Sequence, residues 1–148
     1  PCARAPVPRR GPGMIVVDSN VIAYCWIHGA RTEAAHRLRR LDADWHAPVS
    51  WRSELRNILA GYRRDGSLDE QQVTRIMAAA EAGLAGREHH LPSERVFQVI
   101  EASRLSAYDA EFVALAEILD VTLVTEDRAV LGAFPERAIS IEAAIETG

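Results

Sequence analysis

The amino-acid sequence predicts an α/β fold in which a parallel sheet carries helices on both faces. Two short apolar runs, at 14–17 and 121–125, are rich in β-branched residues and show no polar alternation, as expected of strands buried on both faces. Segments with apolar residues at helical spacing separate and follow these runs, and strands that alternate with helices favour a parallel sheet. With 148 residues, 48% of them hydrophobic, the chain is long enough for one domain with its own core.

The first half of the chain predicts two strands and three helices. The strand "MIVV" at 14–17 is followed by a helix from 19 to about 27, and a second helix covers roughly 31–41. The segment "WHAPV" at 45–49 reads as a short strand that ends near its proline. A helix over 50–66 has an apolar stripe at helical spacing and stops at the Asp-Gly pair.

The second half continues the alternation. A helix over 67–86 carries a further apolar stripe and ends at Gly86, and a weak strand over 87–91 comes before Pro92. Two helices, over 92–104 and 107–119, then lead to the buried strand "VTLVT". The remaining predicted elements are a helix over 127–132, a strand over 137–141 and a closing helix.

Residues 1–13, "PCARAPVPRRGPG", are rich in Pro, Gly and Arg and carry no hydrophobic pattern. We interpret them as a disordered leader or a segment added upstream, so the domain is expected to span 14–148, with Met14 as a candidate start. A basic stretch before so short an apolar run is not typical of a secretory signal, and no run approaches the length of a membrane span. The two cysteines form no disulfide framework; Cys25 is expected in the core, and a cytoplasmic location is favoured.

Composition excludes several kinds of chemistry. All 17 basic residues are arginine, so a P-loop NTPase and a Schiff-base enzyme are excluded, because both depend on a lysine. A phosphoaspartate receiver domain, which also normally uses a lysine, is disfavoured. Residues 14–148 carry 14 arginines and 21 acidic residues, a net charge of −7. Any nucleic acid bound by so acidic a domain must be attracted by local arginines and metal ions.

Carboxylates follow both of the clearest strands. Asp18 ends the first strand, and Asp127 comes directly after the segment at 121–125. In parallel sheets, sites form beyond the carboxyl ends of the strands. Each of these acids also suits the N-cap of the following helix, and Asp109 suits a capping box with Ser106. Taken singly, each is therefore explained equally well by local structure.

Glu54 is the acid that local structure explains least. It lies at the edge of the apolar stripe of its helix rather than on the opposite, solvated face. An ion pair with Arg52 or Arg56 is the alternative explanation. Four carboxylates brought into one cleft would repel each other unless divalent cations were bound, and an oxygen-only ligand set points to Mg²⁺ or Mn²⁺. Such ions can activate water and stabilise a phosphodiester under attack, with no need for a nucleophilic side chain.

The order of these residues resembles the PIN domain, and in particular the VapC-type toxins of bacterial toxin–antitoxin pairs. The resemblance is carried by "DSN" at 18–20, by Glu54 in "SELRN", and by "SAYDAEFVALAEILDVTLVTED" at 106–127, and it covers about 14–142. It implies a three-layer α/β/α sandwich around a short parallel sheet. It also implies an Mg²⁺- or Mn²⁺-dependent ribonuclease that leaves a 3′-hydroxyl and a 5′-phosphate, and a homodimer neutralised by a cognate antitoxin.

The resemblance further implies the roles of individual residues. The catalytic and metal-binding acids are Asp18, Glu54, Asp109 and Asp127. The supporting polar residues, which would orient carboxylates or water, are Ser19, Asn20 and Thr125. Candidate contacts to RNA phosphates, chosen for their nearness in sequence to the acids, are Arg52, Arg56, Arg104 and Arg128; solvated or ion-paired arginines are the alternative.

The five histidines are expected to be structural or solvent-exposed, whereas the role of the apolar residues over 50–84 stays open. The five histidines are scattered, and the His89-His90 pair has no Cys or second His at zinc-ligand spacing. The apolar residues over 50–84 are open to two interpretations, core packing or a seam for a dimer or antitoxin, and Tyr62, Ile76, Met77 and Leu84 are the residues concerned.

A toxin endoribonuclease is the leading hypothesis from the sequence. The alternatives are a housekeeping PIN nuclease in RNA processing or decay and a catalytically silent module that binds RNA or a protein partner. An aspartyl-phosphate phosphatase would require Asp-x-Asp after the first strand, where this chain has Asn20, and usually a lysine as well.

Overall fold

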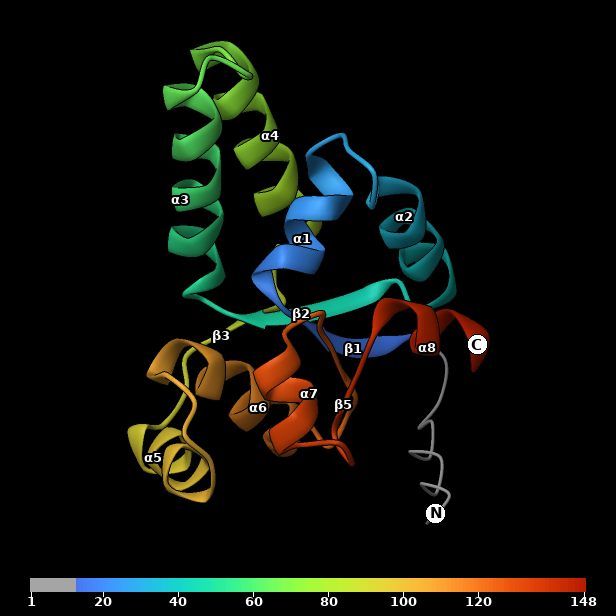
Figure 1. Cartoon of the computed structure of the whole chain (residues 1–148), viewed down its shortest axis with the longest axis vertical. Coiled ribbons are helices and arrows are strands. Elements are labelled where there is room, and N and C mark those ends of the chain that lie inside the picture. The colour runs from blue at the N-terminus through green and yellow to red at the C-terminus, as the bar shows by residue number, and fades with distance from the viewer. Residues whose placement is uncertain (1–12) are drawn as a thin grey trace.

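The computed structural model describes residues 13–148, which form a five-stranded parallel sheet with helices on both faces (Figure 1). The strand order is β3-β2-β1-β4-β5, and every neighbouring pair is parallel. The strands are β1 (Met14–Val17), β2 (Asp44–Pro48), β3 (Glu88–His89), β4 (Leu123–Val124) and β5 (Ala138–Ile139). The predicted disordered leader falls on residues outside this described part, apart from Gly13.

Eight helices connect and flank the described strands, as the spacing of apolar residues predicted. They are α1 (Ser19–Trp26), α2 (Thr32–Leu41), α3 (Trp51–Arg64), α4 (Glu70–Gly83), α5 (Ser93–Ala102), α6 (Ala107–Leu119), α7 (Arg128–Ala133) and α8 (Ile141–Glu146). All the predicted elements are present. The strands β3, β4 and β5 have two residues each and are shorter than expected, and α4 begins only after its N-cap Asp69, whose capping box with Gln72 sets the start.

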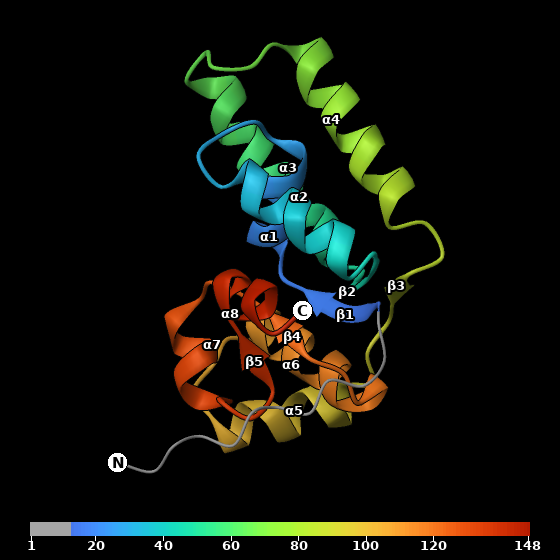
Figure 2. The same cartoon turned by 90° about the vertical axis from the view of Figure 1, so that its right-hand side faces the viewer.

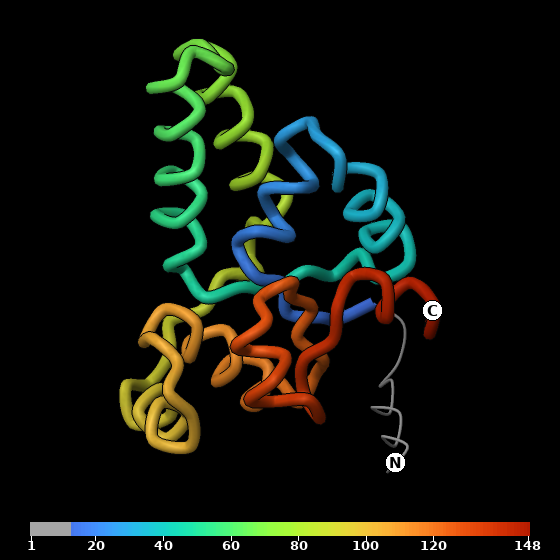
Figure 3. The backbone as a smooth tube through the Cα atoms, viewed as in Figure 1, coloured from blue at the N-terminus to red at the C-terminus, as the bar shows by residue number. Residues whose placement is uncertain are grey.

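The helices form two layers, which confirms the α/β/α sandwich. Helices α1 to α4 lie on one side of the sheet, and α5, α6 and α7 lie on the other (Figures 1 and 2). Helix α6 packs directly on β1, β2 and β4, while α8 packs against α2. Helices α3 and α4 form a hairpin that projects away from the sheet (Figure 3).

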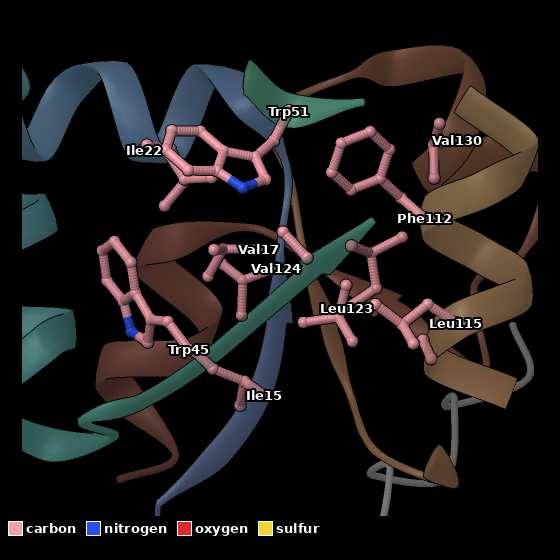
Figure 4. Close-up of a cluster of buried hydrophobic side chains, with 14 of the residues drawn as sticks. Ile15, Val17, Ile22, Trp45, Trp51, Phe112, Leu115, Leu123, Val124 and Val130 are labelled. Carbon is pink, nitrogen blue, oxygen red and sulfur yellow. The ribbon is translucent and has the colours of Figure 1, made fainter. Parts of the chain in front are cut away.

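The core lies on both faces of β1 and its neighbours (Figure 4). Trp45 and Trp51 are fully buried on the side of α1, and the ring of Trp26 meets that of Trp45 edge-on with centroids 6.1 Å apart. On the other side, Phe112 and Leu115 of α6 pack toward Leu123 and Val130. Burying aromatic and branched side chains on both faces explains why β1 reads as a continuous apolar run.

The apolar residues of the α3–α4 hairpin divide between the two interpretations left open by the sequence. Leu84 is fully buried, and Ile76 and Met77 are partly buried against the core, so packing explains them. Tyr62 is 39% exposed and is taken up again below. Cys25 is buried as predicted, and burial raises the pKa of its thiol to about 11. Within residues 13–148, none of the helices combines the length and apolarity that crossing a membrane requires.

The register of the central strands determines where polar side chains meet. Val17 at the end of β1 pairs with Val124 at the end of β4, so the residues that follow both strands emerge side by side. The Asp18 N–H donates to the Val124 carbonyl at 3.2 Å, and this bond continues the pairing one step beyond β1. The strand ends therefore bring Asp18 next to Thr125, although 107 residues separate them in the sequence.

Candidate functional site

Asp18 is both a helix cap and the centre of the site. Its Oδ1 accepts a hydrogen bond from the Val21 N–H at 2.9 Å and so caps α1. Its Oδ2 accepts a short hydrogen bond from the Thr125 hydroxyl. The two interpretations of Asp18, as cap and as site residue, are thus compatible, because each carboxylate oxygen serves one of them.

Thr125 and Asp127 are arranged by the end of β4. The Thr125 side chain is almost fully buried, and its Oγ1 accepts from the Asp127 N–H at 3.0 Å. Asp127 in turn caps α7 by accepting from the Val130 N–H at 3.0 Å. Thr125 therefore links the segment after β4 to the carboxylate that follows β1.

Helices α6 and α3 bring the other two acids. Asp109 lies in the first turn of α6, where its N–H donates to the N-cap Ser106 at 3.2 Å. Glu54 lies in the first turn of α3, and its Oε1 is buried with no hydrogen-bond partner in the described chain. Within residues 13–148 it forms no ion pair with Arg52 or Arg56, so the ion-pair explanation of Glu54 is not realised.

All seven residues predicted for the site line one small cleft. Its open volume is about 30 Å³, room for one or two water-sized species. The polar lining consists of Asp18, Ser19, Asn20, Glu54, Asp109, Thr125 and Asp127. Phe112, Leu123 and Val130 complete it with apolar surface, which places the carboxylates in a poorly solvated environment.

This environment makes the acids harder to ionise. Burial raises the pKa of Asp18 to about 6, against the hydrogen bonds from Thr125 and Val21, and the charge of Asp127 raises it further. Burial also raises the pKa of Glu54, and the charges of Asp109, Asp18 and Glu111 add to that effect while the Ser19 hydroxyl opposes it. The pKa of Asp109 is raised by burial and by Asp127. Each acid therefore feels the charge of at least one other.

The residues fit a divalent cation in donor type and charge. Carboxylate and hydroxyl oxygens are the ligands of Mg²⁺ and Mn²⁺, and a cation would relieve the repulsion that raises these pKa values. Glu54 Oε1 and the buried Ser19 hydroxyl lie near each other without forming a hydrogen bond of normal geometry, so both oxygen atoms are available to a cation or to water. Between residues 13 and 148, no three Asp, Glu, His or Cys side chains already stand close enough to form a closed cage. Binding would thus draw the carboxylates together.

The four candidate arginines differ in their surroundings. Arg52 is engaged: its guanidinium donates to both oxygens of Glu88, at 2.6 and 2.7 Å, and approaches Glu81 at 3.6 Å. This pairing joins α3 to β3 and leaves Arg52 poorly placed to bind phosphate. Arg56, Arg104 and Arg128 are exposed and form no ion pair with a carboxylate of residues 13–148.

Two features near the site and one away from it were missed from the sequence. Glu111 is a fifth acid close to Glu54, and it accepts from the Ser50 hydroxyl at 2.6 Å. Its spacing of two from Asp109 gives no helical signal, which is why it was overlooked. A larger second cleft adjoins the site and is described below. Away from the site, His46 Nδ1 lies 2.8 Å from His89 Nε2, so two histidines 43 residues apart meet on neighbouring strands.

Solved structures share this fold over most of its length. PAE2754 from Pyrobaculum aerophilum superposes with a TM-score of 0.71 at 22% identity, covering 91% of this chain and 96% of that one. FitAcB from Neisseria gonorrhoeae superposes with a TM-score of 0.66 at 20% identity, covering 87% and 99%. At these identities the likeness establishes the fold alone. No curated protein matches the sequence.

A family model matches the sequence itself, and not the fold alone. The model of the PIN domain matches residues 15–135, which contain most of β1, all of β4 and all four acids of the cleft. PIN domains are generally nucleases that use divalent metal ions. The sequence match, the parallel sheet and the acidic cleft agree, and the chain belongs to the PIN domain family.

Proposed function

We propose that this protein is an Mg²⁺- or Mn²⁺-dependent endoribonuclease of the VapC toxin type. The observation that supports it best is the convergence of Asp18, Glu54, Asp109 and Asp127, from four separate elements, on one cleft. Three of these carboxyls have raised pKa values, and perturbed pKa values cluster at functional sites.

The four acids divide between two roles in this proposal. Asp18, Asp109 and Asp127 would hold the cation, and Thr125 fixes the orientation of the Asp18 carboxylate by donating to its Oδ2. Glu54 either joins them or holds the attacking water through its unpartnered Oε1. Ser19 and Asn20 supply further polar contacts to water or carboxylate. When bound, the cation lowers the pKa of water and stabilises the charge that develops on the scissile phosphate.

The proposal also covers the binding partners and the cellular location. As a VapC-type toxin, the protein would act in the cytoplasm, form a homodimer and be neutralised by a cognate antitoxin. The free, buried Cys25 is in keeping with a reducing compartment. Arg56, Arg104 and Arg128 are the arginines retained as candidate contacts to RNA phosphates.

The test is cleavage of a panel of structured RNAs with Mg²⁺, with Mn²⁺ and with EDTA. Wild-type protein should cut with either metal, leave 3′-hydroxyl and 5′-phosphate ends, and be silent in EDTA. Asp18→Asn and Asp109→Asn should lose at least a hundredfold in rate, whereas Glu101→Gln, an exposed acid of α5 outside the cleft, should cut like wild type.

Two results would contradict the proposal. Full metal-dependent activity of Asp18→Asn would remove this residue from the site. Absence of cleavage across the whole panel would favour the silent binding module instead. Growth arrest on expression, relieved by Asp109→Asn and by an antitoxin encoded beside the gene, would separate a toxin from a housekeeping nuclease.

A further inference from the structure

A second and larger cleft opens beside the acidic one. Its open volume is about 220 Å³, and it lies between α1, the loop at 27–32 and α3. Asn20 lines both clefts, so the two adjoin. The volume falls below the ~300–1,000 Å³ of sites for drug-sized ligands, which suits a single ring system.

Two tyrosines give the second cleft aromatic surface. Tyr24 of α1 and Tyr62 of α3 both line it, with Ile58 and Ala23 as apolar surface. Tyr62 is 39% exposed, so its ring is accessible. Burial raises the pKa of the Tyr24 hydroxyl, and the nearby Arg31 lowers it. The cleft thus brings two tyrosine side chains from different helices to one surface.

Arg31 holds one side of this cleft in place. Its guanidinium carbon lies 5.5 Å from the centre of the Tyr24 ring, within the range of a cation–π contact. The same guanidinium pairs with Glu126 at 3.2 Å and with Glu142 at 3.0 Å. With two carboxylates beside it, Arg31 carries little net attraction for a phosphate. The cleft therefore offers aromatic rings rather than positive charge.

We propose that this cleft binds one unpaired nucleobase of the RNA strand, stacked on Tyr62 and Tyr24, when the neighbouring phosphodiester occupies the acidic cleft. This inference rests on the proposed function. Aromatic rings bind bases of single-stranded nucleic acid without needing positive charge, which suits a chain with a net charge of −4. The adjacency of the two clefts at Asn20 favours a base over a side chain of a protein partner, because a base and its phosphate are neighbours in the RNA strand.

The test measures base stacking separately from cleavage. Short single-stranded oligoribonucleotides carrying 2-aminopurine at successive positions are bound with Ca²⁺ in place of Mg²⁺, so that an oxygen-preferring cation neutralises the acidic cleft, and stacking quenches the fluorescence. Wild-type protein should quench at one position, and Tyr62→Ala should lose that quenching and bind about 5- to 150-fold more weakly. Tyr62→Phe keeps the ring and should behave as wild type. Tyr108→Ala is the matched control, because Tyr108 is 65% exposed beside Asp109 but outside this cleft.

The outcomes distinguish this inference from the proposed function. If Tyr62→Ala binds and quenches as wild type while the wild type cleaves RNA, the nuclease stands and the base cleft is wrong. If Tyr62-dependent quenching is found but no RNA is cut with metal, the cleft stands and the proposed nuclease fails. If Tyr62→Ala leaves RNA binding intact but abolishes binding of the antitoxin, the cleft is a protein groove and the inference is overturned.

Discussion

At the scale of single residues, ionisation of the buried Asp18 carboxyl lowers the stability of the folded protein. Burial raises its pKa from 3.8 to about 6, so the folded protein holds this proton more tightly than the unfolded chain does. The stability contributed by the protonated form is complete below about pH 4 and is lost as the pH rises through 6. The shift corresponds to about 3 kcal/mol at pH 8.

Asp18→Asn should therefore stabilise the metal-free protein at high pH. Asparagine keeps an acceptor oxygen for the Val21 N–H and carries no charge; its NH2 group faces Thr125, whose hydroxyl must then accept instead of donate. We expect a gain of up to about 3 kcal/mol in the free energy of unfolding at pH 8, measured by urea denaturation in EDTA, and almost none at pH 4. A gain that does not change between these pH values would contradict the role of ionisation.

Substitutions of Thr125 test the hydrogen bonds that connect the residues after β1 and β4. Thr125→Val removes the donor to Asp18 and the acceptor of the Asp127 N–H, so we expect a loss of about 1–3 kcal/mol in stability. The pKa of Asp18 should rise further, because its hydrogen bond to Thr125 lowers it. The pH dependence of unfolding and the cleavage rate should both reveal the change. Thr125→Ser keeps the hydroxyl and should restore both; equal behaviour of the valine and serine variants would refute the link.

At the scale of elements, the α3–α4 hairpin depends on close contact between helices. A Cβ at Gly83, near the end of α4, would meet the Trp26 ring at 2.9 Å or less, whereas a Cβ at Gly61 in α3 would meet nothing within 4 Å. The Trp26 ring is itself held by Arg39, whose guanidinium carbon lies 4.9 Å from it. The glycine at 83 therefore allows α4 to approach α1.

This pair of glycines gives a matched prediction. Gly83→Ala should cost about 1–3 kcal/mol, because Trp26 and its neighbours must shift. Gly61→Ala should stabilise by about 0.5–1 kcal/mol, because alanine is the better helix former. Chemical denaturation of both variants measures the difference. If both alanines stabilise the protein equally, α4 does not pack as closely on Trp26 as the structure shows.

The elements themselves were largely predictable from the sequence, and their long-range contacts were not. The stripe of α3 and the β-branched run of β1 report local periodicity, so helix and strand could be assigned from them. The meeting of Asp18 with Thr125 depends on the pairing of β1 with β4, which local patterns do not encode. Strand ends and helix positions indicated the four acids, and the resemblance to a family gave them their roles. Neither Glu111 nor the shared cleft of Tyr24 and Tyr62 had a signal in the spacing of the sequence.

At the scale of the whole molecule, the chain has a net charge of −4, and its site gathers four carboxylates. Four carboxylates converge where α1, α3, α6 and the segment after β4 meet, so their repulsion is opposed by the packing of every layer of the fold. A cation bound there would act on the stability of the entire domain, because the ligand binds the folded chain and not the unfolded one.

Metal should therefore raise the melting temperature. At a hundredfold excess over Kd, the gain is about 2.7 kcal/mol, or about 5–10 °C for a domain of this size. Differential scanning calorimetry with Mg²⁺ or Mn²⁺ should show this for the wild type and for Glu101→Gln, but much less for Asp109→Asn. Sodium chloride at matched ionic strength separates binding from screening of the net charge.

The pH dependence makes this prediction specific to the site. Cations compete with protons for the same oxygens, and the pKa values of Asp18, Glu54 and Asp109 are all raised. The melting-temperature gain should therefore be small at pH 5 and should grow as the pH rises through about 6. A gain that is equal at pH 5 and pH 8, or equal in Asp109→Asn and wild type, would mean that the ion binds elsewhere on the acidic surface. The four carboxylates would then be no more than caps and neighbours in the fold.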